Sequence, residues 1–148
     1  MTTYTKSISS EKLYPRIAAM LGIKSIRSDK DLIKYVESRL SVNAISSLIK
    51  YGLTEYEVYS LIIPRRTLSH RKSKRDALNR DESDRAVRIA RILALAEGVF
   101  GDHDKALRWL RKPKRRFDNR SPLELLSTEV GSRAVEELLY QIDFGMAA

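Results

Sequence analysis

Residues 54–75 read TEYEVYSLIIPRRTLSHRKSKR, and this stretch predicts two short helices in close succession. Thr54 and Glu57 form a capping-box pattern, in which each side chain satisfies a backbone amide at the start of a helix. That helix is expected to end as Pro64 opens the next one, because a proline in the first helical turn loses no hydrogen bond. A short helix followed by a basic one is the outline of a helix-turn-helix DNA-binding unit.

The second of these helices is predicted to face outward. Residues 65–75 hold six Lys or Arg and no acid, and Leu68 is their only large apolar side chain. We therefore expect Ile62, Ile63 and Leu68 to anchor the helix while its charges stay in solvent. The turn has Ile-Ile-Pro where a helix-turn-helix often has a glycine, so two adjacent helices of an ordinary helical protein remain the alternative.

The composition describes a globular chain with an excess of positive charge. It has 148 residues, of which 43% are apolar, and a net charge of +9. The length suits one ordinary domain or two small ones. Without a cysteine, the chain has no disulfide, no thiolate nucleophile and no cysteine-ligated zinc. No apolar run approaches the ~20 residues that cross a bilayer, and no secretory signal is visible. We expect a cytoplasmic protein without a membrane partner.

The excess of positive charge lies in the first half of the chain. Residues 1–80 hold 16 Lys and Arg against 7 Asp and Glu, whereas residues 81–148 hold 12 of each. Within the second half, residues 121–148 have one Arg against five acids. A basic front half indicates nucleic acid as a partner, since no amphipathic Lys-rich segment with aromatic membrane anchors is present. A basic surface that only keeps the protein soluble is the alternative.

Helical periodicity runs along nearly the whole chain and predicts an all-α fold. Gly22 and Gly52 each follow an apolar helical stripe and suit a left-handed helix end. From Ile89 to Phe100 the chain is apolar nearly all round, which predicts a buried central helix or a subunit interface. Further helix starts are predicted at Ser28, at Asn79 with Glu82, and at Ser121-Pro122; the last helix is expected to carry Val130, Val135, Leu138, Leu139 and Ile142 on its apolar face.

The sequence lacks catalytic and metal-binding patterns. His70 and His103 lie in separate segments without ligand spacing around them. There is no glycine-rich phosphate loop and no nucleophile elbow. Glu136 and Glu137 are neighbours, which points them ~100° apart on a helix and is a poor arrangement for paired carboxylates. We expect no enzyme activity, no catalytic residue, no metal and no cofactor.

Four segments in a fixed order make the chain resemble a known family. They are LIKYGLTEYEVYSLIIPRRTLSHRK (48–72), ESDRAVRIARILALAEGVFGD (82–102), ALRWL (106–110) and PLELLSTEVGSRAVEELLYQIDFG (122–145). Together they resemble the Xre/MbcA/ParS family of antitoxins over roughly residues 40–146. Among its members they look most like the Xre antitoxins that are paired with RES-domain toxins. The resemblance leaves residues 1–40 largely without an explanation.

The resemblance implies a division of labour along the chain. An Xre-type helix-turn-helix region, which we place at residues 1–79, would bind operator DNA and support dimerisation. A helical toxin-binding domain, which we place at residues 80–148, would neutralise the toxin. RES toxins are NAD-degrading enzymes of an ADP-ribosyltransferase-like fold, and the antitoxin is expected to block their NAD cleft. The implied partners are a cognate RES-domain toxin and operator double-stranded DNA, in a homodimer or a higher hetero-oligomer with the toxin.

One loop departs from the pattern of the family. Many members have a small-residue Leu-Gly-Gly type turn where this chain has Arg116-Phe117-Asp118-Asn119. No toxin contact is carried over for these residues.

The predicted DNA contacts lie on the basic helix. Arg65 and Arg66 stand at its N-terminal end, from which base edges are usually contacted. The hydroxyl and imidazole side chains are candidates for base or phosphate contacts, and the remaining cations for phosphates. RNA is not favoured, because the stretch lacks exposed aromatics on which bases stack. The predicted set is Arg65, Arg66, Thr67, Ser69, His70, Lys72, Lys74 and Arg75; for each of them a solvated surface role is the alternative.

The predicted toxin contacts lie mostly at the C-terminal end. Large apolar side chains so near a chain end fray unless something covers them. The acidic charge beside Asp143 would suit a cleft lined with the cations that hold the NAD pyrophosphate. Packing within the chain is the alternative, above all for Trp109. The predicted set is Trp109, Glu136, Tyr140, Asp143, Phe144, Gly145, Met146, Ala147 and Ala148.

We interpret the chain as a toxin-neutralising antitoxin that also represses its own operon. The alternative is a plain helix-turn-helix transcriptional regulator or nucleoid protein whose C-terminal half only oligomerises. A neighbouring reading frame for a RES-domain protein would favour the first interpretation, and its absence would favour the second.

Overall fold

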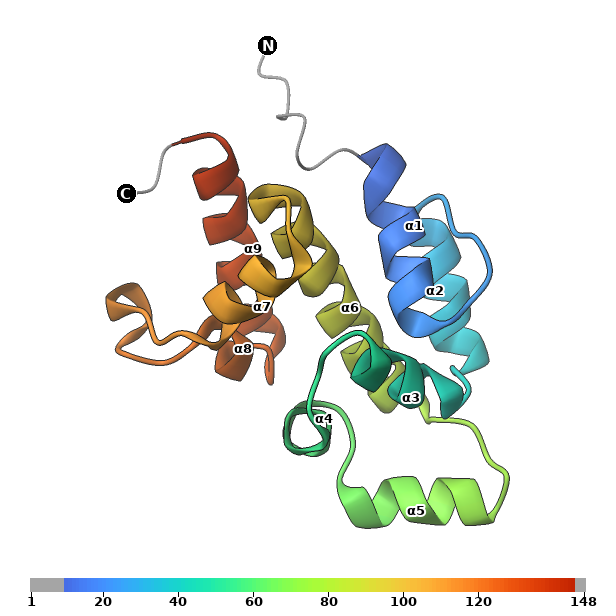
Figure 1. Cartoon of the computed structure of the whole chain (residues 1–148). Helices are drawn as coiled ribbons and strands as arrows, with labels where there is room; N and C mark the ends of the chain where they lie inside the picture. The colour runs from blue at the N-terminus through green and yellow to red at the C-terminus, as the bar shows by residue number, and fades with distance from the viewer. Residues whose placement is uncertain (1–9, 146–148) are drawn as a thin grey trace. The chain divides into compact units, whose positions relative to one another are not determined.

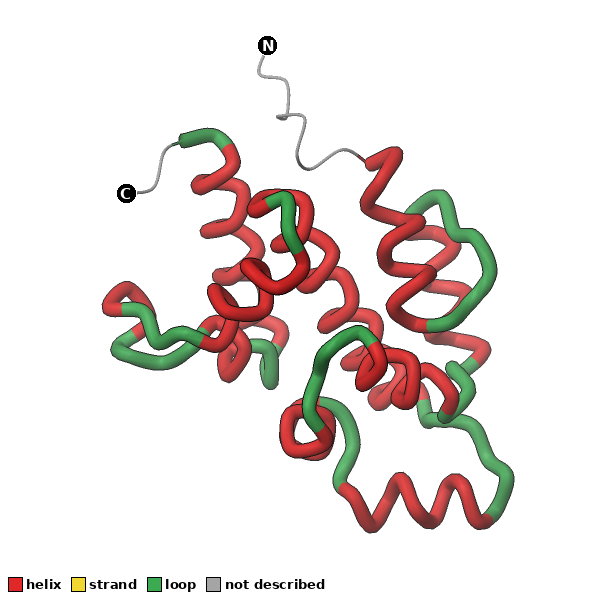
Figure 2. The backbone as a smooth tube through the Cα atoms, viewed as in Figure 1, coloured by secondary structure: helices red, strands yellow, loops and turns green. Residues whose placement is uncertain are grey.

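The computed structural model of the chain describes residues 10–145, which form helices and loops without a strand (Figures 1 and 2). The predicted all-α fold is confirmed. None of the described helices is long and apolar enough to span a bilayer. In chain order the elements are α1 (Ser10–Leu21), α2 (Asp29–Ser38), α3 (Asn43–Lys50), α4 (Glu55–Leu61), α5 (Arg65–Ser73), α6 (Arg80–Phe100), α7 (His103–Arg111), the short 3-10 helix η2 (Arg115–Phe117), α8 (Pro122–Leu125) and α9 (Glu129–Asp143).

The chain divides into two compact units, and the division falls inside α6, after Ala90. One unit contains residues 14–90. Of the described residues, the other contains 91–145 and 10–13. The segment that was predicted to be a central helix or a subunit interface is buried within the single chain, because Ile89, Leu93 and Leu95 are each at most 1% exposed.

Local capping signals place the helix starts in residues 14–90. Ser28 accepts a hydrogen bond from the backbone amide of Asp31 and caps α2. The capping box that opens α4 is complete, since Thr54 Oγ1 accepts from the Glu57 amide and Glu57 Oε1 accepts from the Thr54 amide. Each of these bonds joins residues only three positions apart, so the sequence alone sufficed to predict them. The buried apolar residues of this unit include Ile17, Met20, Leu21, Leu32, Ile45 and Leu48.

A set of long-range hydrogen bonds ties the end of α2 to the segment between α5 and α6. The Arg39 guanidinium donates to the carbonyls of Ala77 and Leu78 and pairs with the Asp76 carboxylate at 3.0 Å. The buried amide of Leu40 donates to Ser83 Oγ at 2.9 Å, and the amide of Leu78 donates to the Leu40 carbonyl. These bonds fix where α6 begins and where the segment after α5 runs.

The last helix predicted from Ser121 is two helices in the structure. Ser121 and Glu124 form the predicted capping box, but α8 has only one turn, and Thr128 then caps α9 by accepting from the Gly131 amide at 3.0 Å. Because the helix restarts at Thr128, its phase changes, and Val130 is 81% exposed instead of buried. The prediction that placed Val130 on the apolar face was wrong. Val135, Leu138 and Leu139 are buried as expected.

The loop between α7 and α8, where the sequence departs from the pattern of the family, contains two consecutive residues with left-handed backbone angles. Asp118 and Asn119 both have left-handed backbone angles, with φ of 54° and 64°. Asp and Asn adopt this region more readily than other residues with a Cβ. The loop therefore makes a left-handed turn without a glycine.

Candidate functional site

The basic helix α5 is held by one apolar face and presents its charges to solvent. Ile62, Ile63 and Leu68 are 2%, 0% and 4% exposed, which confirms the predicted anchor. The helix ends at Ser73, earlier than expected, and Arg75 beyond it has a left-handed φ of 53°. Of the predicted DNA contacts, Thr67 is half-buried, and the others, Arg65, Arg66, Ser69, His70, Lys72, Lys74 and Arg75, are exposed.

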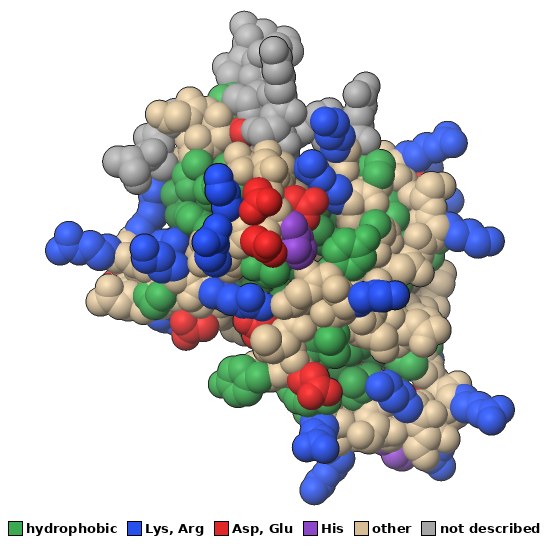
Figure 3. Space-filling view, in the orientation of Figure 1, with side chains coloured by type: hydrophobic (Ala, Val, Ile, Leu, Met, Phe, Trp, Pro, Cys, Tyr) green, Lys and Arg blue, Asp and Glu red, His purple; other side chains and the backbone are tan. Residues whose placement is uncertain are grey.

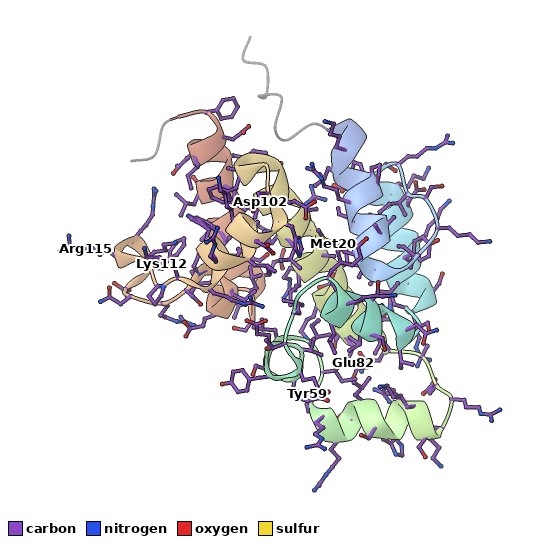
Figure 4. All side chains as sticks on the ribbon, viewed as in Figure 1. Met20, Tyr59, Glu82, Asp102, Lys112 and Arg115 are labelled. Carbon is purple, nitrogen blue, oxygen red and sulfur yellow. The ribbon has the colours of Figure 1, made fainter. Side chains whose placement is uncertain are left out.

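One cation of this helix faces inward and has a structural partner. The Arg71 guanidinium forms two hydrogen bonds of 3.1 Å with the two carboxylate oxygens of Glu82. Glu82 Oε1 also accepts from the Asn79 amide, and Asn79 Oδ1 accepts from the Glu82 amide, which completes the predicted cap of α6. The hydrogen bond to Glu82 raises the pKa of Arg71. Glu82, labelled in Figure 4, thus joins α5 to the start of α6.

The turn before α5 is held by another arginine of α6. Arg85 Nε donates to the carbonyl of Ile62 at 2.9 Å. Ile62 is the residue at the C-terminal end of α4, where carbonyl groups lack helical partners and a cation is favourable. The start of α6 therefore fixes both the end of α4 and the inner side of α5.

A second helix pair in the same unit has the glycine turn that the α4–α5 connection lacks. Gly52 has a φ of 117°, and Leu53 after it is 2% exposed and donates its amide to the Leu48 carbonyl. The helices α3 and α4, which flank this turn, pack against each other. The pair α3–α4 thus has the tight glycine turn typical of a helix-turn-helix, with α4 as its second helix.

The exposed face of α4 was missed at the sequence level. Tyr56 is 79% exposed, and Glu55 and Ser60 beside it are exposed as well. Tyr59, which Figure 4 labels on α4, is half-buried. The signal in the sequence is Gly52, because a glycine at a helix end also suits the tight turn between two paired helices. A large exposed aromatic on the second helix of such a pair is a candidate for contact with a groove.

In the other unit, Trp109 packs against its own chain on part of its surface. Its ring lies 5.3 Å from the Phe100 ring, centroid to centroid, and Lys114 Nζ lies 4.8 Å from the Trp109 ring centroid. Burial, followed by the charge of Lys112, lowers the pKa of Lys114. A cation over an indole ring is a favourable arrangement. Trp109 is half-buried and anchors the loop that contains Lys114.

The end of α9 combines half-buried apolar groups with an acid. Tyr140, Asp143 and Phe144 are all half-buried, and Gly145 is exposed with a φ of 73°. Glu136 differs from these residues, because it forms an ion pair with Arg91 at 3.5 Å. The remaining residues of the predicted toxin contact, Met146, Ala147 and Ala148, lie outside the described residues.

Asp143 is placed where the fold alone does not favour a charge. Its Oδ2 is buried and accepts no hydrogen bond. Burial raises the pKa of its carboxyl group. It is also the last residue of α9, where the helix dipole disfavours a negative charge. A cation from a binding partner would relieve both penalties.

Metal-ligating side chains do not gather in the part of the chain that the structure describes. No group of three or more His, Cys, Asp or Glu with suitable spacing occurs there. His103 Nδ1 lies 2.7 Å from Glu97 Oε2, which joins the start of α7 to α6 within one unit.

Two family models match the chain one after the other. Residues 31–91 match the Antitoxin Xre-like helix-turn-helix domain, and residues 95–145 match the Antitoxin Xre/MbcA/ParS C-terminal toxin-binding domain. The first range contains α3, α4 and α5, and the second contains Trp109 and the end of α9. The boundary after residue 79 stays a prediction.

Curated relatives agree with the family models. A protein named Antitoxin Xre from Pseudomonas putida is 39% identical over 130 residues, which are 88% of this chain and 82% of the relative. Its namesake from Yersinia enterocolitica is 30% identical over 118 residues, covering 78% of this chain and 80% of the relative. A third Antitoxin Xre, from Photorhabdus laumondii, is 34% identical over 84 residues, covering 56% of this chain and 57% of the relative.

Proposed function

The chain belongs to the Xre/MbcA/ParS family of antitoxins, and on that premise we propose that it neutralises a RES-domain, NAD-degrading toxin and represses its own operon. It has a helix-turn-helix domain and a toxin-binding domain. The proposal adds the class of toxin, blockage of the NAD cleft, binding to operator DNA, and a cytoplasmic homodimer or hetero-oligomer with the toxin. A plain DNA-binding regulator is disfavoured, because it leaves the matched toxin-binding domain without a role.

The end of α9 is the observation that carries the toxin contact. Asp143 is a carboxylate with a buried, unpaired oxygen, and the half-buried Tyr140 and Phe144 lie in the same last turn. A cleft that holds the pyrophosphate of NAD must offer cations or amide donors to two phosphate groups. Such a cleft would complement the acidic end of α9, and the aromatic side chains would exclude water around the ion pair.

The toxin contact is tested by co-expression with the adjacent reading frame. The neighbour alone is expected to deplete cellular NAD and stop growth, and the full chain is expected to co-purify with it and restore both. Removal of residues 143–148 should abolish the rescue, while binding to the upstream DNA stays intact. If the truncated chain still rescues growth, the end of α9 is not the contact. If the neighbour leaves NAD untouched, the class of toxin is wrong.

The DNA contact is proposed on α4 and α5 together. The cations on the exposed face of α5, led by Arg65 and Arg66, would neutralise phosphates or reach base edges at the N-terminal end of the helix. The glycine-turn pair α3–α4 favours α4 as the helix in the major groove, with Tyr56 and Ser60 next to the bases. Both helices lie within the matched helix-turn-helix range.

Two variants separate the roles of these helices. Arg65→Ala with Arg66→Ala should lower the slope of log K against log salt by about 1.8, because each lost phosphate contact removes about 0.9. Tyr56→Ala should reduce the preference for the upstream duplex over a scrambled one without changing that slope, if α4 reads bases. The matched control is Lys24→Ala with Lys30→Ala, two exposed cations outside the matched range, which should change neither quantity.

If the two variants show the opposite pattern, base recognition belongs to α5 and not to α4. In that case Arg65 and Arg66 would govern the sequence preference and Tyr56 would be silent. Unchanged DNA binding in both variants would refute the proposed operator contact altogether.

A further inference from the structure

The end of α7 and the loop that joins it to α8 carry a second concentration of positive charge, in the unit that is matched to toxin binding. We call residues 108–120, which include the last turn of α7, the basic loop. It holds seven Lys or Arg and one acid, Asp118. Lys112 and Arg115 are labelled on it at the left of Figure 4. Figure 3, in the same orientation, shows Lys and Arg side chains that protrude at the left of the view. Its exposed cations are Arg108, Arg111, Lys112, Arg115, Arg116 and Arg120.

The basic loop has a fixed shape. Lys114 and Arg120 pair as an isolated antiparallel bridge, in which the Lys114 amide donates to the Arg120 carbonyl at 3.0 Å. The amides of Phe117 and Asn119 both donate to the Lys114 carbonyl, and the Lys114 ammonium lies over Trp109. A preorganised loop loses little conformational entropy when it binds a partner.

The fold does not use most of this charge. Arg108, Lys112, Arg115 and Arg116 form no ion pair with any residue between 10 and 145. Placing like charges side by side without acids is unfavourable for the free chain, since they repel one another. The acids of this half of the chain lie elsewhere, because residues 121–148 hold five acids and one Arg.

The chemistry of the basic loop fits a polyanion better than an ordinary protein surface. Protein interfaces are usually centred on buried aromatic anchors. Here Trp109 packs against Phe100 and lies under Lys114, and Phe117 is half-buried, so the exposed surface is mainly cationic. Double-stranded DNA carries one charge per ~1.7 Å of its axis, and guanidinium groups bind phosphate through two parallel hydrogen bonds.

We propose that the basic loop binds the phosphate backbone of double-stranded DNA, so that the toxin-binding domain adds a contact of its own to the complex. This inference rests on the operator binding proposed above and goes beyond it, because it gives the C-terminal half of the chain a role on DNA. The contact is independent of sequence, since phosphates carry no sequence information. The acidic end of α9 stays available for the toxin.

The test is a salt titration of DNA binding by the full chain. The loop variant combines Lys112→Gln, Arg115→Gln and Arg116→Gln, all at exposed positions. The control combines Lys24→Gln, Arg27→Gln and Lys30→Gln, which removes the same charge from exposed positions outside the matched helix-turn-helix range. The probes are a duplex from upstream of the coding sequence and a scrambled duplex of equal length. Melting temperatures close to that of the wild type would show that both variants are folded.

The loop variant is expected to lower the slope of log K against log salt by about 2.7 on both duplexes, because three contacts each contribute about 0.9. Between 50 and 200 mM salt, the wild type would then lose about 40-fold more affinity than the variant. The control should keep the wild-type slope. Both the control and the loop variant should keep the preference of the wild type for the upstream duplex over the scrambled one.

Three results would overturn the inference, and they differ in what they leave standing. If the loop variant keeps the wild-type slope while Arg65→Ala with Arg66→Ala lowers it, the loop makes no DNA contact and the operator proposal stands. If the loop variant binds DNA normally but no longer co-purifies with the toxin, the cations face a protein. If the wild type binds neither duplex, both proposals fail.

Discussion

Replacing Arg71 by Met should destabilise the protein far more than replacing Arg133 by Met, although Arg133 has the shorter ion pair. Arg71 Nη2 lies 3.1 Å from Glu82 Oε2, and the side chains of Arg71 and Glu82 are 19% and 4% exposed. Arg133 lies 2.9 Å from Glu129, but these side chains are 76% and 72% exposed. The buried pair contributes more to stability, because water screens the exposed pair and reduces its contribution to less than about 0.5 kcal/mol.

The expected loss follows from what remains after the substitution. Met keeps the apolar stem of Arg71 but leaves the Glu82 carboxylate buried without its guanidinium partner, while the Asn79 amide still donates to Glu82 Oε1. Breaking a buried pair from one side costs about 3–5 kcal/mol, and the partial exposure of Arg71 argues for the lower end, about 3 kcal/mol. For a chain of this length, that corresponds to a fall in melting temperature of about 6–12 °C.

The measurement is thermal and urea unfolding of the full chain followed by circular dichroism. The double variant Arg71→Met with Glu82→Gln should be less destabilised than the sum of its single variants, because removing both charges leaves neither of them buried alone. Equal effects of Arg71→Met and Arg133→Met, or strict additivity in the double variant, would refute the reasoning. DNA binding is expected to fall with Arg71→Met even though Arg71 is not one of the proposed DNA contacts, since α5 loses its hydrogen bonds to the start of α6.

Three further substitutions test the unit that contains α9. Gly131→Ala should destabilise the protein by about 2 kcal/mol or more, since a Cβ there would overlap the Leu125 carbonyl group. In urea unfolding, this decrease in the free energy of unfolding should exceed the ~1 kcal/mol expected for Thr128→Ala, which removes only a helix cap. Asp143→Asn should stabilise the free chain by at most about 1 kcal/mol at neutral pH while weakening toxin binding. Burial raises the pKa of Asp143, so the folded state holds the proton longer, and wild-type stability should fall as the pH rises from the unfolded value of 3.8 through the folded pKa. Asp143→Asn should lack this fall in stability. If the variant and the wild type show the same dependence of stability on pH, burial does not raise the pKa of Asp143.

Helix starts and ends could be predicted because their causes are local. The caps at Ser28, Thr54 and Ser121 each bond a residue three positions away, and Gly22 and Gly52 have the left-handed angles that end a helix. Such signals act within one turn of chain and need no partner from elsewhere. The apolar anchor of the basic helix was predictable for the same reason.

The roles of individual side chains were not predictable in this way. Arg71 and Lys72 are neighbours in one basic run, yet one is bound to Glu82 and the other is exposed. Val130 has the spacing of a core residue, yet it is exposed because Thr128 restarts the helix in a new phase. The sequence around Tyr56 does not indicate that this residue is exposed. The packing of α3 against α4 shows that Tyr56 lies on the exposed face of α4.

The sequence by itself determined the all-α class, most helix boundaries, the basic helix and the resemblance to a family of antitoxins. These depend on periodicity, capping and the order of motifs, all of which are properties of the chain in one dimension. The tertiary structure decided which cations are structural, which face of α4 is exposed, and that Asp143 has a buried oxygen without a partner. Those properties depend on residues up to tens of positions apart coming together, and only the packed chain brings them into contact.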